Sequence, residues 1–414
     1  MSRGHESRDI DDVVQEWMAD VAPRRAPDRL LEESFARTMA TKQAAAYPWD
    51  RIRRPRPRGE LARPRRRLAV AGLVAAIALA TGTALLALRP NPATVGGPPP
   101  SAIPSPTPSP ISSPSLSPIT VTPEATIPVT GPVGIATDGQ SVWLFTSGGQ
   151  LVRIDPTTNT VAASATLNPL KDAYQGLAVN KAGVWLTDWD TSLVERFDPT
   201  TLDLLGSVAV GPNPKGVLTT DAAVWVANTR GGSVARIDPA TNTVVATVSP
   251  TGPTGPSGPN WLAEGLGSIW VGVPNSSSIV RIDEATNAIV ARITVVKNSP
   301  CGGLAVGPAA VWITGCDGTT VLSRIDPTSN TESTAIDLGG HAYTVALVAG
   351  APWTSPEDGL LVRINPTTNV IDRVIAPGPE YRGGGDVVVA AGSLWVVDNA
   401  HNHVIRIALT DLGD

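Results

Sequence analysis

Short segments in which apolar, mostly β-branched residues alternate with polar ones fill the chain after residue 118. The first four of them read VGIAT (133–137), SVWLF (141–145), QLVRID (150–155) and NTVAASATL (159–167). Gly, Asn, Asp and Pro separate them. Alternation of this period, punctuated by turn residues, is typical of antiparallel strands. The pattern therefore predicts a four-stranded antiparallel sheet over residues 133–167.

This four-strand pattern recurs. The phrase LVRIDPTTNTV at 151–161 returns in five near-copies and one truncated copy, and a second marker, a tryptophan after a small or apolar residue, keeps step with it. The tryptophans lie 40 to 45 residues apart and are Trp143, Trp185, Trp225, Trp270, Trp312, Trp353 and Trp395. Seven units of four short strands predict an all-β, seven-bladed β-propeller over 119–414. Each tryptophan is expected in the core between blades.

The recurring phrase also predicts the turn between the third and fourth strands of a blade. In the first copy, Asp155 can accept hydrogen bonds from the backbone ahead, Pro156 presets φ, and Asn159 tolerates the left-handed conformation. The seventh unit has no convincing fourth strand. Upstream, ITVTPEATIPVT (119–130) is a strand without a blade. It is expected to complete blade seven and close the ring, which removes the free edges.

Two cysteines occur in the chain, Cys301 and Cys316, in the segment CGGLAVGPAAVWITGC. A hairpin centred between Pro308 and Ala309 places them opposite each other, at a separation that permits a disulfide. The alternative is a pair of free thiols without a role. A disulfide requires an oxidising compartment outside the cytoplasm.

A membrane segment is predicted upstream of the propeller. Leu68 to Leu88 is free of charge over 21 residues, enough to span roughly 30 Å of hydrocarbon. The positive-inside bias places residues 1–67 in the bacterial cytoplasm and the propeller outside. A buried core helix and a cleaved signal peptide are the alternatives, and the flanking charges and the length of the preceding region argue against them. The arginines on the near side are Arg51, Arg53, Arg54, Arg56, Arg58, Arg63, Arg65, Arg66 and Arg67.

The regions flanking this segment differ in composition. Residues 1–67 contain two short stretches with helical apolar spacing, 9–20 and 26–39, which bury little by themselves. Residues 89–118 are rich in Pro, Ser and Thr, as expected for an extended linker. Residues 1–67 carry 16 Lys or Arg against 11 Asp or Glu, and the remainder carries 16 against 26. This acidic balance argues against a nucleic-acid partner for the propeller.

Residues that break the repeat gather in the loops after the second and fourth strands of the blades, on one face of the predicted ring. Rare polar aromatic residues in loops that the scaffold does not require suggest a binding face. The alternative is that loops are simply where non-repeat residues persist. The predicted binding-face residues are Lys171, Tyr174, Asp188, Trp189, Asp190, Asn228, Arg230, Trp261, Asp317, His341, Tyr343, Tyr381, Arg382, Asp398 and His401.

The evidence for chemistry at this face is thinner. His341, with Glu380 or Asp398 from neighbouring blades, is the candidate for a general acid or base. Asp188 and Asp190 can ligate Ca²⁺ or Mg²⁺, yet two carboxylates are an incomplete coordination shell, so no metal site is predicted. No G-x-S-x-G, H-E-x-x-H or P-loop pattern appears.

The segments GPVGIATDGQSVWLF, LVRIDPTTNTVAASATL and VWVANTRGGSVARIDPATNTVVATV resemble YVTN-type propellers and the streptogramin (virginiamycin B) lyase-like family over 119–414. The resemblance implies a seven-bladed ring outside the cytoplasm. In lyases of that family it further implies Mg²⁺ and a His–Glu set that opens a cyclic depsipeptide. The Arg-rich anchor resembles bacterial single-span proteins that display propellers.

Two functions follow from these observations. The first is a single-pass membrane protein whose extracytoplasmic propeller binds or senses a peptide, a glycan, a cell-wall component or another protein, without a cofactor. The second is a Mg²⁺-dependent lyase or lactone hydrolase of the streptogramin lyase type. The first needs no bound ion, so a divalent ion at the site would separate the two.

Overall fold

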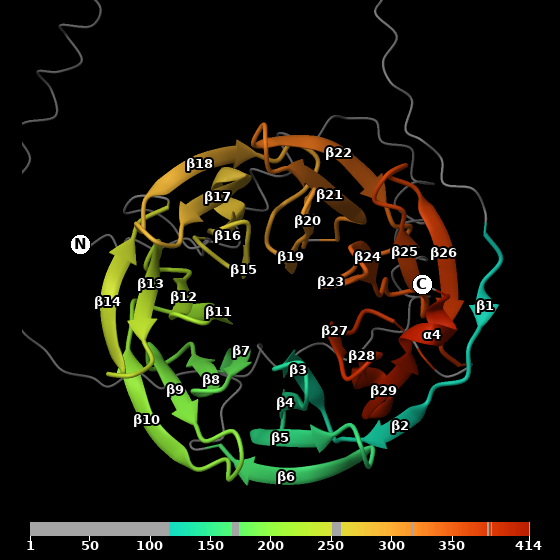
Figure 1. Cartoon of the computed structure of the whole chain (residues 1–414), viewed down its shortest axis with the longest axis horizontal. Helices are drawn as coiled ribbons and strands as arrows, with labels where there is room; N and C mark the ends of the chain where they lie inside the picture. The colour runs from blue at the N-terminus through green and yellow to red at the C-terminus, as the bar shows by residue number, and fades with distance from the viewer. Residues whose placement is uncertain are drawn as a thin grey trace, which may run out of the picture. The chain divides into compact units, whose positions relative to one another are not determined.

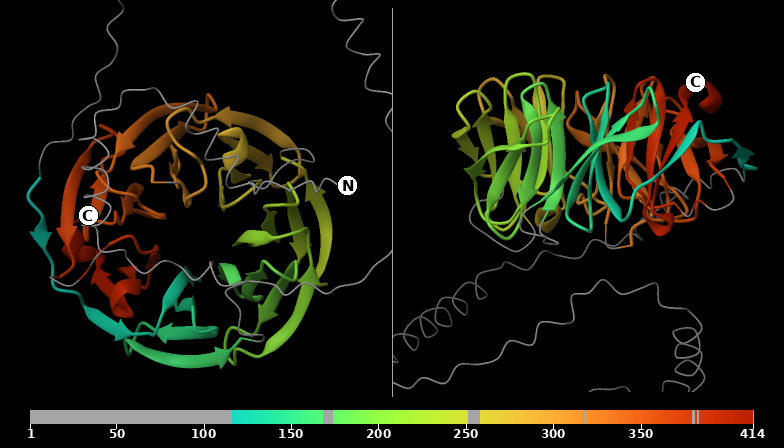
Figure 2. Two further views of the ribbon diagram at one scale, coloured as in Figure 1. Left: turned by 180° about the vertical axis from the view of Figure 1, so that it is seen from behind. Right: turned by 90° about the horizontal axis from the view of Figure 1, so that it is seen from below.

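The computed structural model describes residues 116–167, 174–250, 258–316, 318–378, 381 and 383–413. Within these residues seven sheets stand in a ring around a central axis (Figure 1). The strands of each sheet run between the two ends of the ring (Figure 2). The seven-bladed propeller with four antiparallel strands per blade is thus confirmed, with one blade extended by a fifth strand.

The strands follow one another from the axis outward in every blade. Blades one to three comprise β3 (Pro132–Thr137), β4 (Val142–Thr146), β5 (Gln150–Asp155), β6 (Thr160–Thr166); β7 (Tyr174–Asn180), β8 (Gly183–Asp188), β9 (Leu193–Phe197), β10 (Leu204–Ala209); and β11 (Pro214–Thr219), β12 (Val224–Asn228), β13 (Ser233–Asp238), β14 (Thr243–Val248). Blades four and five comprise β15 (Leu262–Gly265), β16 (Ser268–Val273), β17 (Ser278–Asp283), β18 (Ile289–Thr294); and β19 (Leu304–Val306), β20 (Val311–Thr314), β21 (Val321–Asp326), β22 (Thr331–Asp337).

Blades six and seven differ at their outer edge. They comprise β23 (Val345–Val348), β24 (Ala351–Thr354), β25 (Leu361–Ile364), β26 (Ile371–Ala376); and β27 (Val387–Ala390), β28 (Ser393–Asp398), β29 (His403–Ala408). Strand β2 (Ala125–Pro128) pairs antiparallel with β29 as the fourth strand of blade seven. Strand β1 (Ile119–Thr120) pairs in parallel with β26 as a fifth strand of blade six.

The closing strand predicted at 119–130 is therefore divided between two blades. Residues 125–128 close the ring as expected, whereas the start of the segment lies one blade earlier. Pro123 lies in the crossing between β1 and β2, and proline lacks the backbone donor that a continuous strand would need there.

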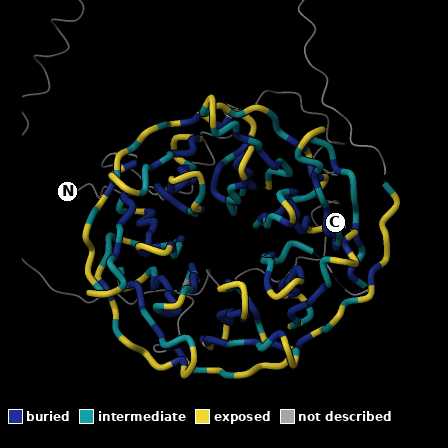
Figure 3. Tube along the Cα trace, in the orientation of Figure 1, coloured by how far each residue is buried: buried dark blue, intermediate teal, exposed yellow. Residues whose placement is uncertain are grey.

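The core lies between the blades, where the second strands are buried on both faces (Figure 3). All seven repeat tryptophans occupy this layer and are at most 2% exposed. The prediction that they form the core is confirmed. Outer strands instead alternate exposed and half-buried residues, as in β6 and β18. A strand that is buried on both faces has a continuous run of apolar residues, as VWLF and IWVGV do.

The repeat arginine connects each tryptophan to the next blade. Arg196 lies over the ring of Trp185, 5.2 Å from its centroid, and donates to the carbonyl of Ala182 in its own blade. Its outer nitrogen reaches the turn of blade three, donating to the Pro239 carbonyl at 2.7 Å and to Asn242 Oδ1 at 2.8 Å. We call this set of contacts the arginine latch.

The latch recurs at three further joints of the ring. At each of them an arginine donates to a backbone carbonyl and to an asparagine Oδ1 in the turn of the next blade. The contacts are Arg236 to the Glu284 carbonyl and Asn287, Arg281 to the Pro327 carbonyl and Asn330, and Arg406 to the Pro156 carbonyl and Asn159. The asparagine of the turn has positive φ, 55° in Asn242, a conformation that asparagine adopts more readily than most residues. The phrase IDPTTN thus forms a hairpin in one blade and receives an arginine from the preceding blade.

The other three joints lack the latch for visible reasons. Leu202 replaces the turn asparagine of blade two, so Arg153 of blade one has no side-chain acceptor at that position. Arg324 donates to Ser333 of its own blade, and Asn369 Oδ1 in the next turn is buried without a hydrogen bond. Arg363 pairs with Asp372 of its own blade at 2.7 Å, because blade seven closes with β2 and has no such turn.

The predicted disulfide is present. Cys301 and Cys316 are bonded, with Cα atoms 5.6 Å apart, and the register of β19 with β20 is the one expected from the sequence. The predicted cytoplasmic region, membrane helix and most of the linker lie outside the described residues. Among the residues that are described, no helix is long and apolar enough to cross a membrane.

We expect Arg196→Ala to lower the free energy of unfolding by about 1.5–3 kcal/mol more than Arg324→Ala, because only Arg196 makes charge-assisted hydrogen bonds to the next blade. Both arginines lie over a tryptophan and contact a carbonyl of their own blade, so Arg324 is a matched control. Urea unfolding of the full-length chain in detergent micelles measures the difference. Equal losses would show that the latch does not stabilise the joint.

Candidate functional site

One position of the inner strands distinguishes the blades. In each blade one inner-strand residue pairs with the core tryptophan of the second strand, and the position in question lies two residues before it. It is at the start of the inner strand, where the chain arrives from the preceding blade. In four blades it is glycine, namely Gly134, Gly176, Gly216 and Gly303. In blades four, six and seven it is Trp261, Thr344 and Asp386.

Glycine at this position follows from the approach of neighbouring blades. A Cβ on Gly176 would lie 2.2 Å from the carbonyl oxygen of Lys215 in the next blade, and one on Gly216 2.3 Å from that of Asn260. A Cβ on Gly303 would lie 2.9 Å from the Cα of Thr344. Contacts this short exclude a side chain at Gly176, Gly216 and Gly303.

The inner strands are partly exposed along the axis. Their mid-strand residues Ile135, Leu177, Leu218, Ala346 and Val388 are only half-buried, although no strand lies inside them. We call the end of the inner strands that contains the glycine-replacing residues the axial mouth. The described loops that join second to third strands lie at this end of the blades.

Cations lie over aromatic rings on the side of blades two to four. Lys215 Nζ is 5.5 Å from the ring centroid of Trp261, and the Arg230 guanidinium is 5.8 Å from that of Trp189. Such contacts contribute about 0.5–1 kcal/mol at exposed sites. They hold two half-exposed indole rings in place and present positive charge beside them.

Asp386 is the carboxylate at the mouth in blade seven. The residue is half-buried, with Thr344 of blade six beside it, and burial raises the pKa of Asp386 to about 7 while the hydrogen bond with Thr344 opposes the rise. Thr344 Oγ1 also accepts the amide of Val387 at 2.9 Å. The threonine thus joins the inner strands of blades six and seven.

His341, Tyr343 and Glu357 form a second polar group over blades five and six. His341 Nδ1 is 3.5 Å from Glu357 Oε1, which also accepts from the Tyr343 hydroxyl at 3.2 Å. The two rings meet edge to face at 4.4 Å. His341 Nε2 is 3.2 Å from the Gly315 carbonyl, next to the disulfide of Cys316.

The carboxylate beside His341 is therefore Glu357, from the loop after β24. The sequence favoured Glu380 or Asp398. Asp398 is buried and pairs with His401 instead, Oδ2 to Nδ1 at 2.9 Å, and also accepts the His401 amide. This pair closes the turn after β28, since the two residues are only three positions apart.

Tyr381 is buried, and its hydroxyl shares a hydrogen bond with Ser355. Burial raises the pKa of Tyr381 far above its usual value, the bond to Ser355 opposes this, and the charge of Asp398 adds to it. A phenol this hard to ionise serves as a neutral hydrogen-bonding group.

Three other predicted residues are placed by the scaffold. Asp188 is 2% exposed and accepts the amides of Asp190 and Thr191, which closes the turn after β8. Asp190 is exposed. Tyr174 begins β7 opposite Asp188.

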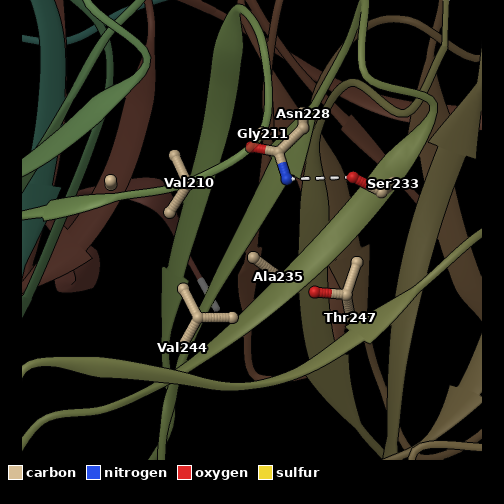
Figure 4. A pocket seen from close by; sticks show the side chains of 8 residues that line it. Val210, Gly211, Asn228, Ser233, Ala235, Val244 and Thr247 are labelled. Carbon is tan, nitrogen blue, oxygen red and sulfur yellow. Dashed lines mark hydrogen bonds between the residues drawn. The ribbon is translucent and has the colours of Figure 1, made fainter.

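Asn228 lines a groove of about 240 Å³ between blades two and three, away from the axis. Its Nδ2 donates to Ser233 Oγ at 3.1 Å, as Figure 4 shows. The remaining lining is mostly small and apolar, with Val210, Gly211 and Ala235 near the amide. Lys171, Asp317, Glu380 and Arg382 lie outside the described residues.

No group of three or more His, Cys, Asp or Glu side chains that could hold a metal ion occurs among the residues the structure describes. The pairs His341–Glu357 and Asp398–His401 are each two ligands, and Asp188 uses its carboxylate on backbone amides.

Several solved structures share this fold. Hydrazine synthase from Kuenenia stuttgartiensis matches with a TM-score of 0.58 at 13% identity, over 70% of this chain and 97% of its own. A catalytically inactive virginiamycin B lyase from Staphylococcus aureus, solved with quinupristin, matches with a TM-score of 0.56 at 16% identity, over 67% and 95%. BamB from Moraxella catarrhalis gives 0.49 at 14% identity, over 68% and 83%.

The first two likenesses show the propeller fold alone, since both proteins are less than 25% identical to this chain. No protein-family model matches the chain, and no curated protein matches its sequence. The resemblance of the sequence to the streptogramin lyase-like family is thus supported for the fold only.

Four residues at the mouth and its rim were not predicted from the sequence: Lys215, Thr344, Glu357 and Asp386. Three of them begin or directly precede inner strands, whereas the predicted residues were chosen from loops. The signal that could have found Thr344 and Asp386 is the missing glycine, which is visible when the seven units are aligned on their tryptophans.

Asp386 should make stability depend on pH. Its folded pKa of about 7 lies above its ordinary value of 3.8, so the stability it contributes is present below pH 3.8 and is lost as pH rises through 7. We expect Asp386→Asn to remove this loss and to gain stability over the wild type between pH 4 and pH 8. Urea unfolding of both chains at pH 4, 6 and 8 measures it; a pH-independent difference would contradict the raised pKa.

Proposed function

We propose that this chain is a membrane-anchored binding protein whose extracytoplasmic propeller takes its ligand at the axial mouth. The observation that carries the proposal is the replacement of glycine by Trp261, Thr344 and Asp386 at one level of the ring. The scaffold requires no side chain there, and in other blades it excludes one. Polar and aromatic groups converging on an opening are the usual features of a binding site.

The location outside the cytoplasm is supported by two independent features. The uncharged segment 68–88 follows a cluster of arginines and precedes a Pro-rich linker, which together favour a retained anchor with the propeller outside. The disulfide of Cys301 and Cys316 fits an oxidising compartment.

A lyase-like enzyme is the second candidate, and the pair His341–Glu357 favours it. An imidazole and a carboxylate 3.5 Å apart on the loop face can move a proton. Three ligands or more for Mg²⁺ are not gathered among the described residues, which is why we place binding first.

Topology can be tested in cells. With one epitope tag at each end of the chain, we expect protease added to spheroplasts to remove the C-terminal tag and leave the N-terminal tag intact. Lysis before digestion, which should expose both, is the control. Protection of both tags in intact spheroplasts would overturn the extracytoplasmic location.

Ligand binding at the mouth can be tested with two probes, trialanine and tri-N-acetylglucosamine, by saturation-transfer NMR on the full-length chain in micelles. We expect at least one probe to bind, and Trp261→Gly, which restores the residue found in four other blades, to abolish that binding. Val245→Thr, on an exposed outer strand, is the control. Binding unchanged by Trp261→Gly would place the site elsewhere.

The same preparation separates the two candidates. Under the binding proposal, EDTA and an excess of Mg²⁺ or Ca²⁺ give the same melting temperature. An ion that binds only the native state and is present at a hundred times its Kd adds about 2.7 kcal/mol to the free energy of unfolding. A metal-dependent rise in melting temperature that His341→Ala removes would favour the lyase.

A further inference from the structure

The disulfide joins the two ends of the inner hairpin of blade five. Cys301 lies three residues before β19, and Cys316 lies two residues after β20. With three residues, β19 is the shortest of the seven inner strands, and it pairs with β20 through three residue pairs. The covalent bond therefore adds a connection where the strand pairing is shortest.

A contact with the next blade depends on the ends of this hairpin. Blades five and six stand side by side in the ring (Figure 1). The backbone carbonyl of Tyr343, just before the inner strand of blade six, accepts the Gly303 amide at 2.8 Å and the Thr314 hydroxyl at 2.9 Å. Gly303 follows Cys301 by two positions, and Thr314 precedes Cys316 by two. The disulfide thus ties together the two strand ends that bind this carbonyl.

His341 adds a side-chain contact to the same joint. Its Nε2 lies 3.2 Å from the carbonyl oxygen of Gly315, the residue directly before Cys316. Its Nδ1 lies 3.5 Å from Glu357 Oε1, and its carbonyl accepts the Glu357 amide at 3.0 Å. The imidazole is therefore held between the disulfide-linked loop of blade five and the loop after β24 of blade six.

A comparable joint without a disulfide connects blades three and four. There the Gly216 amide donates to the Asn260 carbonyl at 3.0 Å, and Thr229 Oγ1 donates to the Pro259 carbonyl at 2.8 Å. The inner strand β11 of blade three spans six residues, twice the length of β19. This joint has the same kind of backbone contact and no cysteine, so it is a matched reference.

We infer that the disulfide is a redox-sensitive clamp whose reduction releases His341 from blade five. The inference does not rest on the proposed function. Cys301 is 5% exposed and Cys316 is half-buried, so a thiolate of a dithiol reductant attacks Cys316 Sγ. The S–S bond breaks and Cys301 leaves as the thiolate. The second thiol of the reductant then displaces Cys316, so that two electrons and two protons pass to the cysteines and the reductant leaves as its own disulfide.

Reduction acts on the two contacts of His341 differently. Without the cross-link, the ends of the hairpin depend on a ladder of three residue pairs, and local opening requires less free energy. The Gly315 carbonyl then separates from Nε2. The contacts with Glu357 persist, because they are made by the neighbouring loop of blade six and include a backbone hydrogen bond.

Nuclear magnetic resonance of the full-length chain in micelles, with 15N-labelled histidine, tests the release. Which ring nitrogen carries the proton is set by the hydrogen bond that the other one makes. We expect excess dithiothreitol to change the ring 15N shifts of His341 and not those of His401, which Asp398 holds in blade seven. His341→Gln assigns the resonance. Reoxidation with oxidised glutathione should restore it.

Amide hydrogen exchange on the same samples measures the joint. We expect the Gly303 amide to exchange at least about tenfold faster after reduction, which is about 1.4 kcal/mol, and the Gly216 amide to keep its rate. The chain with Cys301→Ser and Cys316→Ser should match the reduced wild type and not respond to dithiothreitol, which controls for other effects of the reductant. If this variant does not fold, the wild type reduced in its folded state still gives the comparison.

Three results would overturn the inference. The first is a disulfide that excess dithiothreitol leaves intact in the folded chain, as measured by mass after alkylation. The second is complete reduction with the His341 shifts and the Gly303 exchange rate unchanged. The third is an equal change at Gly216 and His401, which would make the disulfide a general support of the fold.

Discussion

The arginine latch connects the core of one blade to the turn of the next at four of the seven joints of the ring. A guanidinium is planar and carries five donors, so one face can lie on tryptophan while its edge reaches oxygen acceptors in two blades. In Arg196 these acceptors belong to different blades, a carbonyl before β8 and the turn after β13. One set of residues thus combines the buried tryptophan, the hairpin turn and the contact between blades. This is why the tryptophan and the IDPTTN phrase recur at the same spacing along the sequence.

The latch also explains why the two ends of the ring differ. It lies where the turns between first and second and between third and fourth strands gather, so mutations there affect two blades at once. The other end has contacts between blades of its own, which use a threonine in place of the arginine: Thr187 Oγ1 donates to the Lys215 carbonyl, and Thr344 Oγ1 accepts the Val387 amide. Arg406 closes the ring through two kinds of contact. It latches blade seven to the turn at Pro156 and Asn159, and it pairs with Glu124 of the closing segment at 3.0 Å.

Much of the fold could be predicted because its determinants are local and repeated. Period, tryptophan positions and turn chemistry all appear within a single unit. The second role of Asn242 could not be read in this way, because its arginine partner lies 46 residues earlier and only the closed ring brings them together. The pairing of β1 with blade six was not predicted either, because residues 119–120 were assigned to the strand that closes blade seven.

The site was harder to predict for a related reason. Rare polar residues in loops were taken as candidates, yet the carboxylates of Asp188 and Asp398 are used by the turns that follow their own strands. Short-range hydrogen bonding of Asp to the backbone competes with any functional role. Conversely, Lys215 and Thr344 lie within or beside strands, where a polar residue looks like ordinary scaffold until the neighbouring blade is known.

A propeller built from identical blades would have no preferred direction at its axis. Every group at the mouth would be repeated seven times, and a ligand could bind in any of seven equivalent orientations. Loss of glycine in blades four, six and seven, together with Lys215 in blade three, breaks this equivalence at a single level of the ring. The four latches lie at the opposite end of the ring, so the residues at the mouth take no part in them. Different side chains at equivalent positions of the ring are what give an axial ligand one preferred orientation.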